Sequence, residues 1–300
     1  MTGDAKKGWA LILGGSSGLG LATARKLARH GFDLVIVHRD RRADIKEIQS
    51  HFQKISSNGI QLKSYNLDVA NAEKRSTAIG EIKSLLEEGQ TLKVLVHSIA
   101  KGSLKPMFFE ERSPSEERNP LGDQNHSKER KPAERRNLSR NSNWQGERSP
   151  VLDHRDFELT LNAMALSLYD WTKELANEGL FDADARIISF TSEGSSKAWP
   201  GYAAVSAAKA TLEALTRNIA LEFASIGIKA NCIQAGTTDT KAFRMIPDHG
   251  SIKENALQRN PNSRLTLPED IANAVYLLTT EEARWITGTV IKVDGGESLR

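Results

Sequence analysis

Short apolar runs alternate with longer amphipathic runs along nearly the whole chain, and this alternation restricts the possible folds most. Short runs rich in β-branched residues predict strands, while apolar residues three or four positions apart predict helices. Strand and helix in strict alternation predict a parallel sheet with helices on both faces. The predicted strands are 9–15, 32–38, 60–66, 92–100, 185–192, 228–236 and 289–296. We therefore expect an α/β fold, a Rossmann-type doubly wound parallel sheet, as a single domain over residues 1–300.

The segment from residue 111 to residue 150 interrupts this alternation. Its only apolar side chains are Leu121, Ala133, Leu138 and Trp144, among Glu, Arg, Lys, Ser, Asn and Pro. Such a composition cannot bury enough apolar surface to offset the entropy lost on ordering. We expect a disordered or loosely packed insertion, which is either a solvated loop without a dedicated role or a docking surface for a partner.

Composition and charge exclude several classes of protein. The 41 basic and 38 acidic residues give a net charge of only +3, so bulk charge does not indicate a nucleic-acid partner. The single cysteine, Cys232, excludes an intrachain disulfide and a multi-cysteine metal site, and its apolar surroundings predict a buried thiol. The chain has no apolar stretch long enough for a membrane span or a signal peptide. We expect a cytoplasmic protein without a metal.

A glycine-rich turn follows the first predicted strand directly. In "LILGGSSGLGLATARKLARHG", Gly14 permits the turn, Gly18 lets the backbone approach a pyrophosphate, and Gly20 allows the helix to pack on the sheet. Backbone N–H groups at the start of the helix would face the phosphates. A purely structural turn is the alternative. The position of this turn within a strand–turn–helix–strand unit favours a dinucleotide site.

The end of the second predicted strand, "VIVHRDRRAD", bears on the choice of nucleotide. His38 stands where a carboxylate usually holds the adenosine ribose hydroxyls of NAD, and Arg39 follows it. A guanidinium group suits a 2′-phosphate, and a missing carboxylate removes a repulsion against it. NADPH is therefore favoured over NADH. Asp40 argues the other way, unless it and the neighbouring arginines simply form a solvated helix start.

These motifs together resemble the short-chain dehydrogenase/reductase superfamily. "GGSSGLG" is similar to its glycine motif, although Leu13 occupies the usual threonine position, and "LDV" places Asp68 near the adenine. "QAGTTDT" is similar to the stretch that contacts the nicotinamide carboxamide, and "VDGGESL" to the last strand and its tail. The resemblance covers the chain outside residues 111–150 and implies a homotetramer. It implies nucleotide contacts from Gly14, Ser16, Ser17, Gly18, Leu19, Gly20, Arg39, Asp68, Val69, Ser98, Ile99, Ala100, Lys209, Gly236, Thr238 and Thr240.

Within the superfamily, four features resemble the enoyl-[acyl-carrier-protein] reductases that retain the glycine-rich motif. The fourth strand ends in "VHSIA", and six residues separate Tyr202 from Lys209. Position 192 is serine rather than tyrosine, and "LTLNAMAL" contains Asn162. The resemblance implies NADPH-dependent reduction of the 2,3 double bond of enoyl thioesters on acyl carrier protein, a step of fatty acid biosynthesis.

The spacing of Tyr202 and Lys209 is consistent with reduction of a conjugated double bond. On a helix, seven positions advance about 10.5 Å and return to nearly the same face, whereas the more familiar spacing of four advances about 6 Å. Hydride goes to the carbonyl carbon in ketone reduction but to Cβ, two bonds further from the oxygen, in enoyl reduction. A phenol further from the ammonium would therefore suit the enoyl thioester.

The resemblance assigns the catalytic roles to three residues. Lys209 is expected to bind the nicotinamide ribose hydroxyls, and Tyr202 to hydrogen-bond the thioester oxygen. Ser192 stands where the family has a second hydroxyl, or it is an ordinary strand-end serine. Tyr169 and Lys173 in "YDWTK" have the familiar spacing of four, but they precede the strand that carries Ser192. We expect them to lie on a helix that packs on the sheet or on a neighbouring subunit.

Residues 241–261, here called the flap, resemble the mobile segment that covers the acyl chain in such enzymes. Phe243, Met245 and Ile246 could line an apolar slot, and closure would exclude water; the alternative is a surface helix. The basic run "KERKPAERR", residues 128–136, could contact an acidic carrier protein or could simply be solvated.

The sequence is also compatible with two other functions. A 3-ketoacyl or general carbonyl reductase of the same superfamily would share the nucleotide site but would prefer lysine at position 206, where this chain has Ser206. A non-enzymatic NADPH-binding regulator would use the charged insertion as an interaction arm. Retention of Tyr202, Lys209 and Asn162 argues against the regulator.

Overall fold

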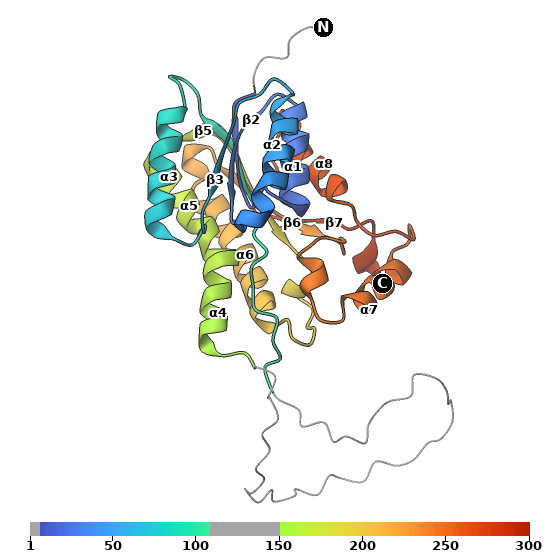
Figure 1. The fold of residues 1–300 in the computed structure, drawn as a ribbon. Coiled ribbons are helices and arrows are strands. Elements are labelled where there is room, and N and C mark those ends of the chain that lie inside the picture. Colours follow the sequence, from blue (N-terminus) through green and yellow to red (C-terminus); the bar gives the residue numbers. More distant parts are fainter. Residues whose placement is uncertain (1–6, 109–150) are drawn as a thin grey trace, which may run out of the picture.

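The computed structural model describes residues 7–108 and 151–300, which form a seven-stranded sheet between two layers of helices (Figure 1). The strand order is β3-β2-β1-β4-β5-β6-β7, and all neighbouring strands are parallel. The strands are β1 (Trp9–Leu13), β2 (Asp33–His38), β3 (Leu62–Asn66), β4 (Leu92–His97), β5 (Phe181–Thr191), β6 (Lys229–Ala235) and β7 (Val290–Val293). The predicted α/β fold is confirmed, and each of the seven strands overlaps a predicted apolar run. The predicted insertion at 111–150 lies outside the described residues.

Among the described residues, three helices cover each face of the sheet. Helices α1 (Gly18–Arg29), α2 (Ile45–Ser56) and α8 (Pro268–Leu278) pack in one core, and α3 (Ala72–Leu85), α5 (Ser167–Asn177) and α6 (Ala203–Glu222) in the other. Helices α4 (His154–Leu161) and α7 (His249–Arg259) lie at the lower end of the molecule in Figure 1. No helix within the described ranges is both long enough and apolar enough to cross a bilayer.

The side chains of β1 show why nearly continuous apolar strands are needed. Trp9, Leu11 and Leu13 enter the core beneath α3, α5 and α6, whereas Ala10 and Ile12 enter the core beneath α1, α2 and α8. Successive strand side chains point to opposite faces, so a strand covered on both faces must be apolar throughout. The edge strand β3 departs from this pattern, because only one of its neighbours is a strand and its side chains are partly or fully exposed.

The chain on the two sides of the insertion is joined at the body of the protein. The backbone N–H of Leu152 donates to the carbonyl of Pro106 (2.9 Å), and Lys105 Nζ lies 2.8 Å from Asp156 Oδ2. Asp156 also accepts a hydrogen bond from Ser103 Oγ, at 2.8 Å. These contacts hold the segment after β4 against the start of α4, so the body of the fold is closed on both sides of residues 109–150.

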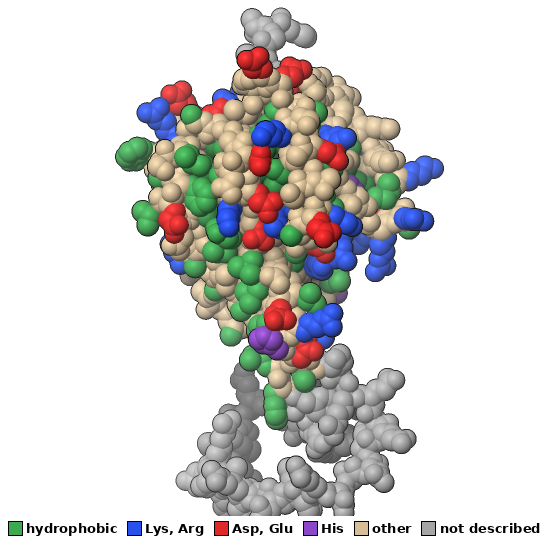
Figure 2. Space-filling model, turned by 90° about the vertical axis from the view of Figure 1, so that its left-hand side faces the viewer, with side chains coloured by type: hydrophobic (Ala, Val, Ile, Leu, Met, Phe, Trp, Pro, Cys, Tyr) green, Lys and Arg blue, Asp and Glu red, His purple; other side chains and the backbone are tan. Residues whose placement is uncertain are grey.

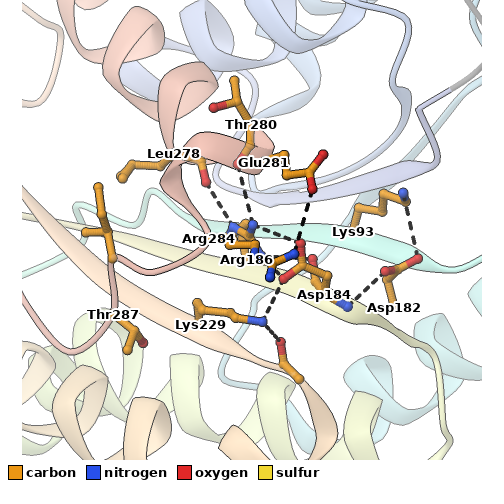
Figure 3. Close-up of polar contacts among 12 residues, drawn as sticks. Lys93, Asp182, Asp184, Arg186, Lys229, Leu278, Thr280, Glu281, Arg284 and Thr287 are labelled. Carbon is orange, nitrogen blue, oxygen red and sulfur yellow. Dashed lines mark hydrogen bonds and ion pairs between the residues drawn. The ribbon is translucent and has the colours of Figure 1, made fainter.

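A buried guanidinium joins the amino-terminal side of the sheet to the end of α8 (Figure 3). Arg186, in β5, forms a two-pronged ion pair with Asp184 at 2.6 and 2.9 Å and donates to the carbonyl of Leu278 at 3.1 Å. Lys229 of β6 reaches the same carboxylate at 2.6 Å. The hydrogen bond from Arg186 is the largest influence on the pKa of Asp184 and holds it well below its usual range, with Lys229 adding to this effect.

Asp184→Asn is expected to lower the free energy of unfolding at pH 7 by about 2 kcal/mol. The Arg186 side chain is only 4% exposed and would lose its counter-charge, although solvent reaches the carboxylate and moderates the effect. A native pKa below the unfolded one means that this contribution is present above the unfolded value and is lost as pH falls through the native value. The difference in the free energy of unfolding between wild type and Asp184→Asn, measured with urea, should therefore become smaller as the pH is lowered. Glu281→Gln is the matched control, because Glu281 is 84% exposed and 3.7 Å from Arg284. Equal midpoints and slopes for Asp184→Asn and wild type at pH 7 would contradict the prediction.

Candidate active site

A cavity of about 790 Å³ opens at the carboxyl ends of the central strands. The strand order reverses between β1 and β4, so the connections from these two strands run in opposite directions and leave a crevice there. The segments after β1, β2, β4, β5 and β6 all contribute to the wall of the cavity. Ligands of doubly wound sheets bind at such a point.

The turn after β1 has the close approaches that its glycines permit. Gly14 has φ +89°, and a Cβ atom there would lie 2.2 Å from the carbonyl oxygen of Ser98. A Cβ atom on Gly20 would lie 2.1 Å from the carbonyl oxygen of Gly14. Gly20 does not line the cavity, and its role is to let α1 pack against the turn. The turn and the start of α1 therefore form a backbone cradle of the kind that accommodates a pyrophosphate.

The other residues predicted to contact the nucleotide are brought together at this cavity. Its wall includes Gly14, Ser16, Ser17, Gly18, Leu19, Arg39, Asp68, Val69, Ser98, Ile99, Ala100, Lys209, Gly236, Thr238 and Thr240. They come from six separate segments of the sequence. The cradle, the polar side chains at its rim and the volume of the cavity fit a nicotinamide dinucleotide. Within the described part of the chain, no group of three or more His, Cys, Asp or Glu residues is arranged to hold a metal.

Basic side chains surround the acidic group at one end of the cavity. Asp68 Oδ2 lies 3.0 Å from both Arg39 Nη1 and Lys101 Nζ. Burial raises the pKa of Asp68, but the hydrogen bonds from Lys101 and the Ala70 backbone and both nearby charges outweigh burial and lower it. His38 is buried, and its Nδ1 lies 2.9 Å from Asp40 Oδ2. The Asp40 carboxylate is therefore directed towards His38, while the Arg39 guanidinium is 58% exposed.

Tyr202 lies at the opposite end of the cavity, immediately before α6. It occupies the N-cap position, and its carbonyl accepts the backbone N–H of Ser206 at 2.8 Å. The side chain is buried, and its ring packs edge-on against Trp199 at a centroid distance of 5.4 Å. Burial raises the pKa of Tyr202. The phenol is therefore protonated at neutral pH.

The Ser192 hydroxyl is a buried polar group without a partner of its own. It directly follows β5 and lines the cavity beside Tyr202. Its Oγ atom is inaccessible to solvent and has no hydrogen-bond partner among the described residues. A buried hydroxyl is normally hydrogen-bonded, so this atom is suited to pair with a group that enters the cavity.

Lys209 lies in α6 and lines the cavity. Its Nζ donates to the carbonyl of Phe190 at 2.5 Å, and the residue is only 8% exposed. Burial lowers the pKa of Lys209 to about 8. Two of its three N–H donors remain for groups that enter the cavity, such as ribose hydroxyls.

His97, the last residue of β4, is a buried group near Lys209 that the sequence analysis did not single out. Burial, followed by the charge of Lys209, lowers the pKa of His97 to about 3, so its ring is neutral. Its Nε2 lies 2.8 Å from Ser167 Oγ, which itself donates to the carbonyl of Ala163. This carbonyl belongs to the π-helical turn Asn162–Leu166 between α4 and α5. Asn162 opens that turn and does not line the cavity.

Apolar side chains cover the cavity around Tyr202. The flap contributes Phe243, Met245 and Ile246, as predicted, and these residues lie before α7. The facing wall is formed by Leu104, Met164, Trp199 and Val205. The flap thus contains a helix, α7, and the part of the flap before α7 lines the cavity.

Tyr169 and Lys173 lie away from the cavity. Both are on α5, neither lines the cavity, and Lys173 Nζ is 5.8 Å from the centre of the Tyr169 ring. Between them, Trp171 is fully buried and donates to the carbonyl of Val69 at 3.1 Å. This helix therefore packs on the sheet, as expected.

Several residues on the cavity wall were not predicted from the sequence. They are Lys101, Glu193, Trp199, Asp294 and Glu297. Glu193 directly follows Ser192, so its position was within reach of local reasoning. Glu297 lies in the tail, and only the folded structure brings it to Thr237.

Comparison with known proteins identifies the family. Residues 143–298, just over half of the chain, match a family profile described as "Enoyl-(Acyl carrier protein) reductase", and residues 8–118 match one described as "KR domain". The chain belongs to the short-chain dehydrogenase/reductase superfamily. It is an NAD(P)-dependent oxidoreductase of that superfamily.

Individual members of the superfamily share the whole length of the chain. A hydroxy(phenyl)methyl-succinyl-CoA dehydrogenase subunit of Thauera aromatica is 25% identical over 293 residues, with 97% of this chain and 96% of the relative aligned. A short-chain dehydrogenase/reductase of Serratia marcescens superposes with a TM-score of 0.72 at 22% identity, over 98% of both chains. The enoyl-[acyl-carrier-protein] reductase (NADH) of Aquifex aeolicus superposes with a TM-score of 0.73 at 21% identity, also over 98% of both chains. At this level of identity the two structures establish a shared fold.

Proposed function

We propose that this protein reduces the 2,3 double bond of enoyl thioesters with NADPH. The observation that carries the proposal is the arrangement of Tyr202, Ser192 and Lys209 on one cavity with an apolar wall beside the phenol. The profile match over residues 143–298 supports the same reaction class. Acyl chains are apolar, so a slot covered by the flap suits this class of substrate.

The three polar residues have separate tasks in this proposal. The nucleotide, when bound, supplies the hydride. Lys209 holds the ribose hydroxyls with its free N–H donors, and its ammonium group keeps the local potential positive. Tyr202 donates a hydrogen bond to the thioester oxygen, where negative charge develops during reduction. Ser192, which lacks a protein partner, orients the same oxygen.

A paired assay tests the reaction. We expect NADPH oxidation with crotonyl thioester to exceed that with acetoacetyl thioester by at least about tenfold in kcat/KM. The alternative, a 3-ketoacyl or carbonyl reductase, is favoured by the "KR domain" match over residues 8–118 and by the Thauera relative, which is named a dehydrogenase. Brisk ketone reduction with no activity on the unsaturated thioester would establish that alternative. Nucleotide binding without turnover of either substrate would point to a regulator.

The preference for NADPH is expected to depend on Arg39. Arg39→Ala should raise the dissociation constant for NADPH about tenfold and change that for NADH less than twofold, because only NADPH carries the 2′-phosphate. Nucleotide fluorescence titration measures both constants. Arg42→Ala is the matched control, since Arg42 is exposed and does not line the cavity. A wild-type protein that binds NADH more tightly would contradict the assignment of NADPH.

We propose acyl carrier protein as the carrier of the substrate and the cytoplasm as the compartment. The basic run 128–136, a candidate contact for the carrier, lies outside the described residues. Replacing residues 112–150 with a short linker should preserve folding, because Leu152 and Pro106 already close the body of the protein. We expect the KM for carrier-linked substrate to rise at least fivefold and that for the coenzyme A thioester to stay within twofold. Equal KM values for both proteins on carrier-linked substrate would remove the insertion from carrier binding.

We also propose that four copies associate. Figure 2 shows apolar side chains on the side of the molecule that carries α4 and α5, where Leu159, Leu166 and Tyr169 are 52%, 39% and 38% exposed. Exposed apolar patches on soluble proteins commonly mark interfaces. Light scattering should give four times the 33.1 kDa chain mass, and Leu159→Glu should lower it.

A further inference from the structure

Arg259, the last residue of α7, holds two buried carboxylates that come from distant parts of the chain. Its Nη2 lies 3.0 Å from Glu193 Oε2 and 3.1 Å from Glu297 Oε1. The side chains of Glu193 and Glu297 are only 11% and 4% exposed, and that of Arg259 is 24% exposed. These ion pairs therefore differ from the solvated pairs on the rest of the flap.

Each carboxylate is attached to a segment that forms the active site. Glu193 immediately follows Ser192 and also accepts a hydrogen bond from Lys197 Nζ at 2.7 Å. Glu297 accepts the backbone N–H of Thr237 at 2.9 Å and the Thr237 hydroxyl at 2.7 Å, and Thr237 immediately precedes Thr238. Both carboxylate-bearing residues line the cavity.

The two carboxylates need the guanidinium group in order to lie close together. Both carboxylates contact the same nitrogen of Arg259. Without the guanidinium group, two negative charges held so near to one atom in a poorly solvated environment would repel each other. Glu193 retains Lys197 as a second cation, whereas Arg259 is the only cation that forms an ion pair with Glu297 among the described residues. Arg259 itself does not line the cavity, so it can act on bound molecules only through these partners.

We propose that Arg259 is a positioning residue that couples the flap to two segments of the cavity wall, the turn that carries Ser192 and the Thr237–Thr238 segment. Through Glu193 it fixes the turn that carries Ser192, and through Glu297 it fixes the Thr237–Thr238 segment. Docking of α7 thereby orders the groups that meet the substrate oxygen and the nucleotide. The inference takes the role of Ser192 from the proposed function and the nucleotide contact of Thr238 from the family resemblance, but it does not depend on which thioester is reduced.

Arg264 provides the matched control. It also forms a two-pronged pair, with Asp270 at 2.6 and 3.2 Å, but its side chain is 54% exposed and does not line the cavity. Such exposed pairs contribute little to stability. Arg264→Met therefore removes an equivalent side chain, an ion pair and a trypsin site without touching the coupled segments.

The test compares Arg259→Met, Arg259→Lys and Arg264→Met in the full-length protein. We expect Arg259→Met to raise the NADPH dissociation constant and the thioester KM about tenfold each and to speed trypsin cleavage at the exposed Lys241 and Arg244. Arg259→Lys should recover part of the loss, because one ammonium group can reach one carboxylate but not hold both in a fixed geometry. Arg264→Met should match wild type in all three measurements.

Unchanged nucleotide affinity, KM and cleavage rate in Arg259→Met would overturn the proposal. If that variant does not fold, Glu297→Gln keeps the side-chain shape and is expected to raise the NADPH dissociation constant at least threefold with a similar melting temperature. An unchanged constant there would equally overturn it. Nucleotide affinity and cleavage are measured without turnover, so a protein that reduces ketones instead of enoyl thioesters would disprove the proposed function while leaving this test intact.

Discussion

Tyr202→Phe is expected to lower kcat on enoyl thioester by at least about a hundredfold, because removing one donor to a developing oxyanion has effects of that size. The substitution deletes a single oxygen atom and leaves the ring packed against Trp199, so the fold should be retained. Affinity for NADPH should change little, since the phenol belongs to the substrate end of the cavity. Steady-state kinetics and nucleotide titration measure the two effects separately.

Tyr169→Phe is the control for this experiment. Tyr169 is 38% exposed on α5 and lies away from the cavity. The kcat of Tyr169→Phe should therefore stay within twofold of wild type. The opposite result, with Tyr169→Phe inactive and Tyr202→Phe active, would show that the four-residue pair performs the chemistry. It would also remove the geometric argument for a conjugated substrate.

Lys209→Met is expected to abolish most activity without weakening the fold. We expect kcat/KM to fall at least about a hundredfold, because both nucleotide binding and the positive potential beside Tyr202 are lost. The melting temperature of the nucleotide-free protein at pH 7 should stay the same or rise, because a buried ammonium is replaced by an apolar side chain of similar length. Lys173→Met, on the exposed side of α5, is the control and should leave activity unchanged.

The pH dependence of stability gives a second measurement on the same pair of proteins. The native pKa of Lys209 is about 8, below its ordinary value of 10.5, so the unfolded chain binds more protons between these two values. The free energy of unfolding of wild type should therefore rise relative to Lys209→Met as pH increases from 8 to 10.5, and this gain is lost as pH falls through 8. Parallel pH profiles for the two proteins would show that the ammonium is not buried.

The strands were predictable from the sequence because parallel strands covered on both faces must be apolar throughout. The start of β5 was not predicted correctly, because the strand begins at Phe181 rather than at residue 185. Its first four residues, "FDAD", include two acidic side chains and differ from the continuous apolar run that follows, and Phe181 is in the strand because it pairs with Leu92 of β4. An alternation over only four residues is too short to predict where this strand begins.

The position of Tyr202 shows a similar limit at the active site. The sequence pattern predicts Tyr202 on the helix, whereas it lies at the N-cap and α6 begins at Ala203. Pro200 and Gly201 precede it, and the positive φ of Gly201 (+73°) is incompatible with an earlier helix start. The start of α6 was therefore predictable from Pro200 and Gly201. The contacts of Arg259 were not predictable from the sequence, because its partners Glu193 and Glu297 are 66 and 38 positions away.

The closure between Pro106 and Leu152 has a consequence for how the chain can be altered. Because the body of the protein already brings these two points together, the entropy needed to tether an added segment rises only with the logarithm of its length. Whole foreign domains with adjacent termini, such as a fluorescent reporter, should therefore be accepted in place of residues 109–150. This junction is thus a suitable graft point.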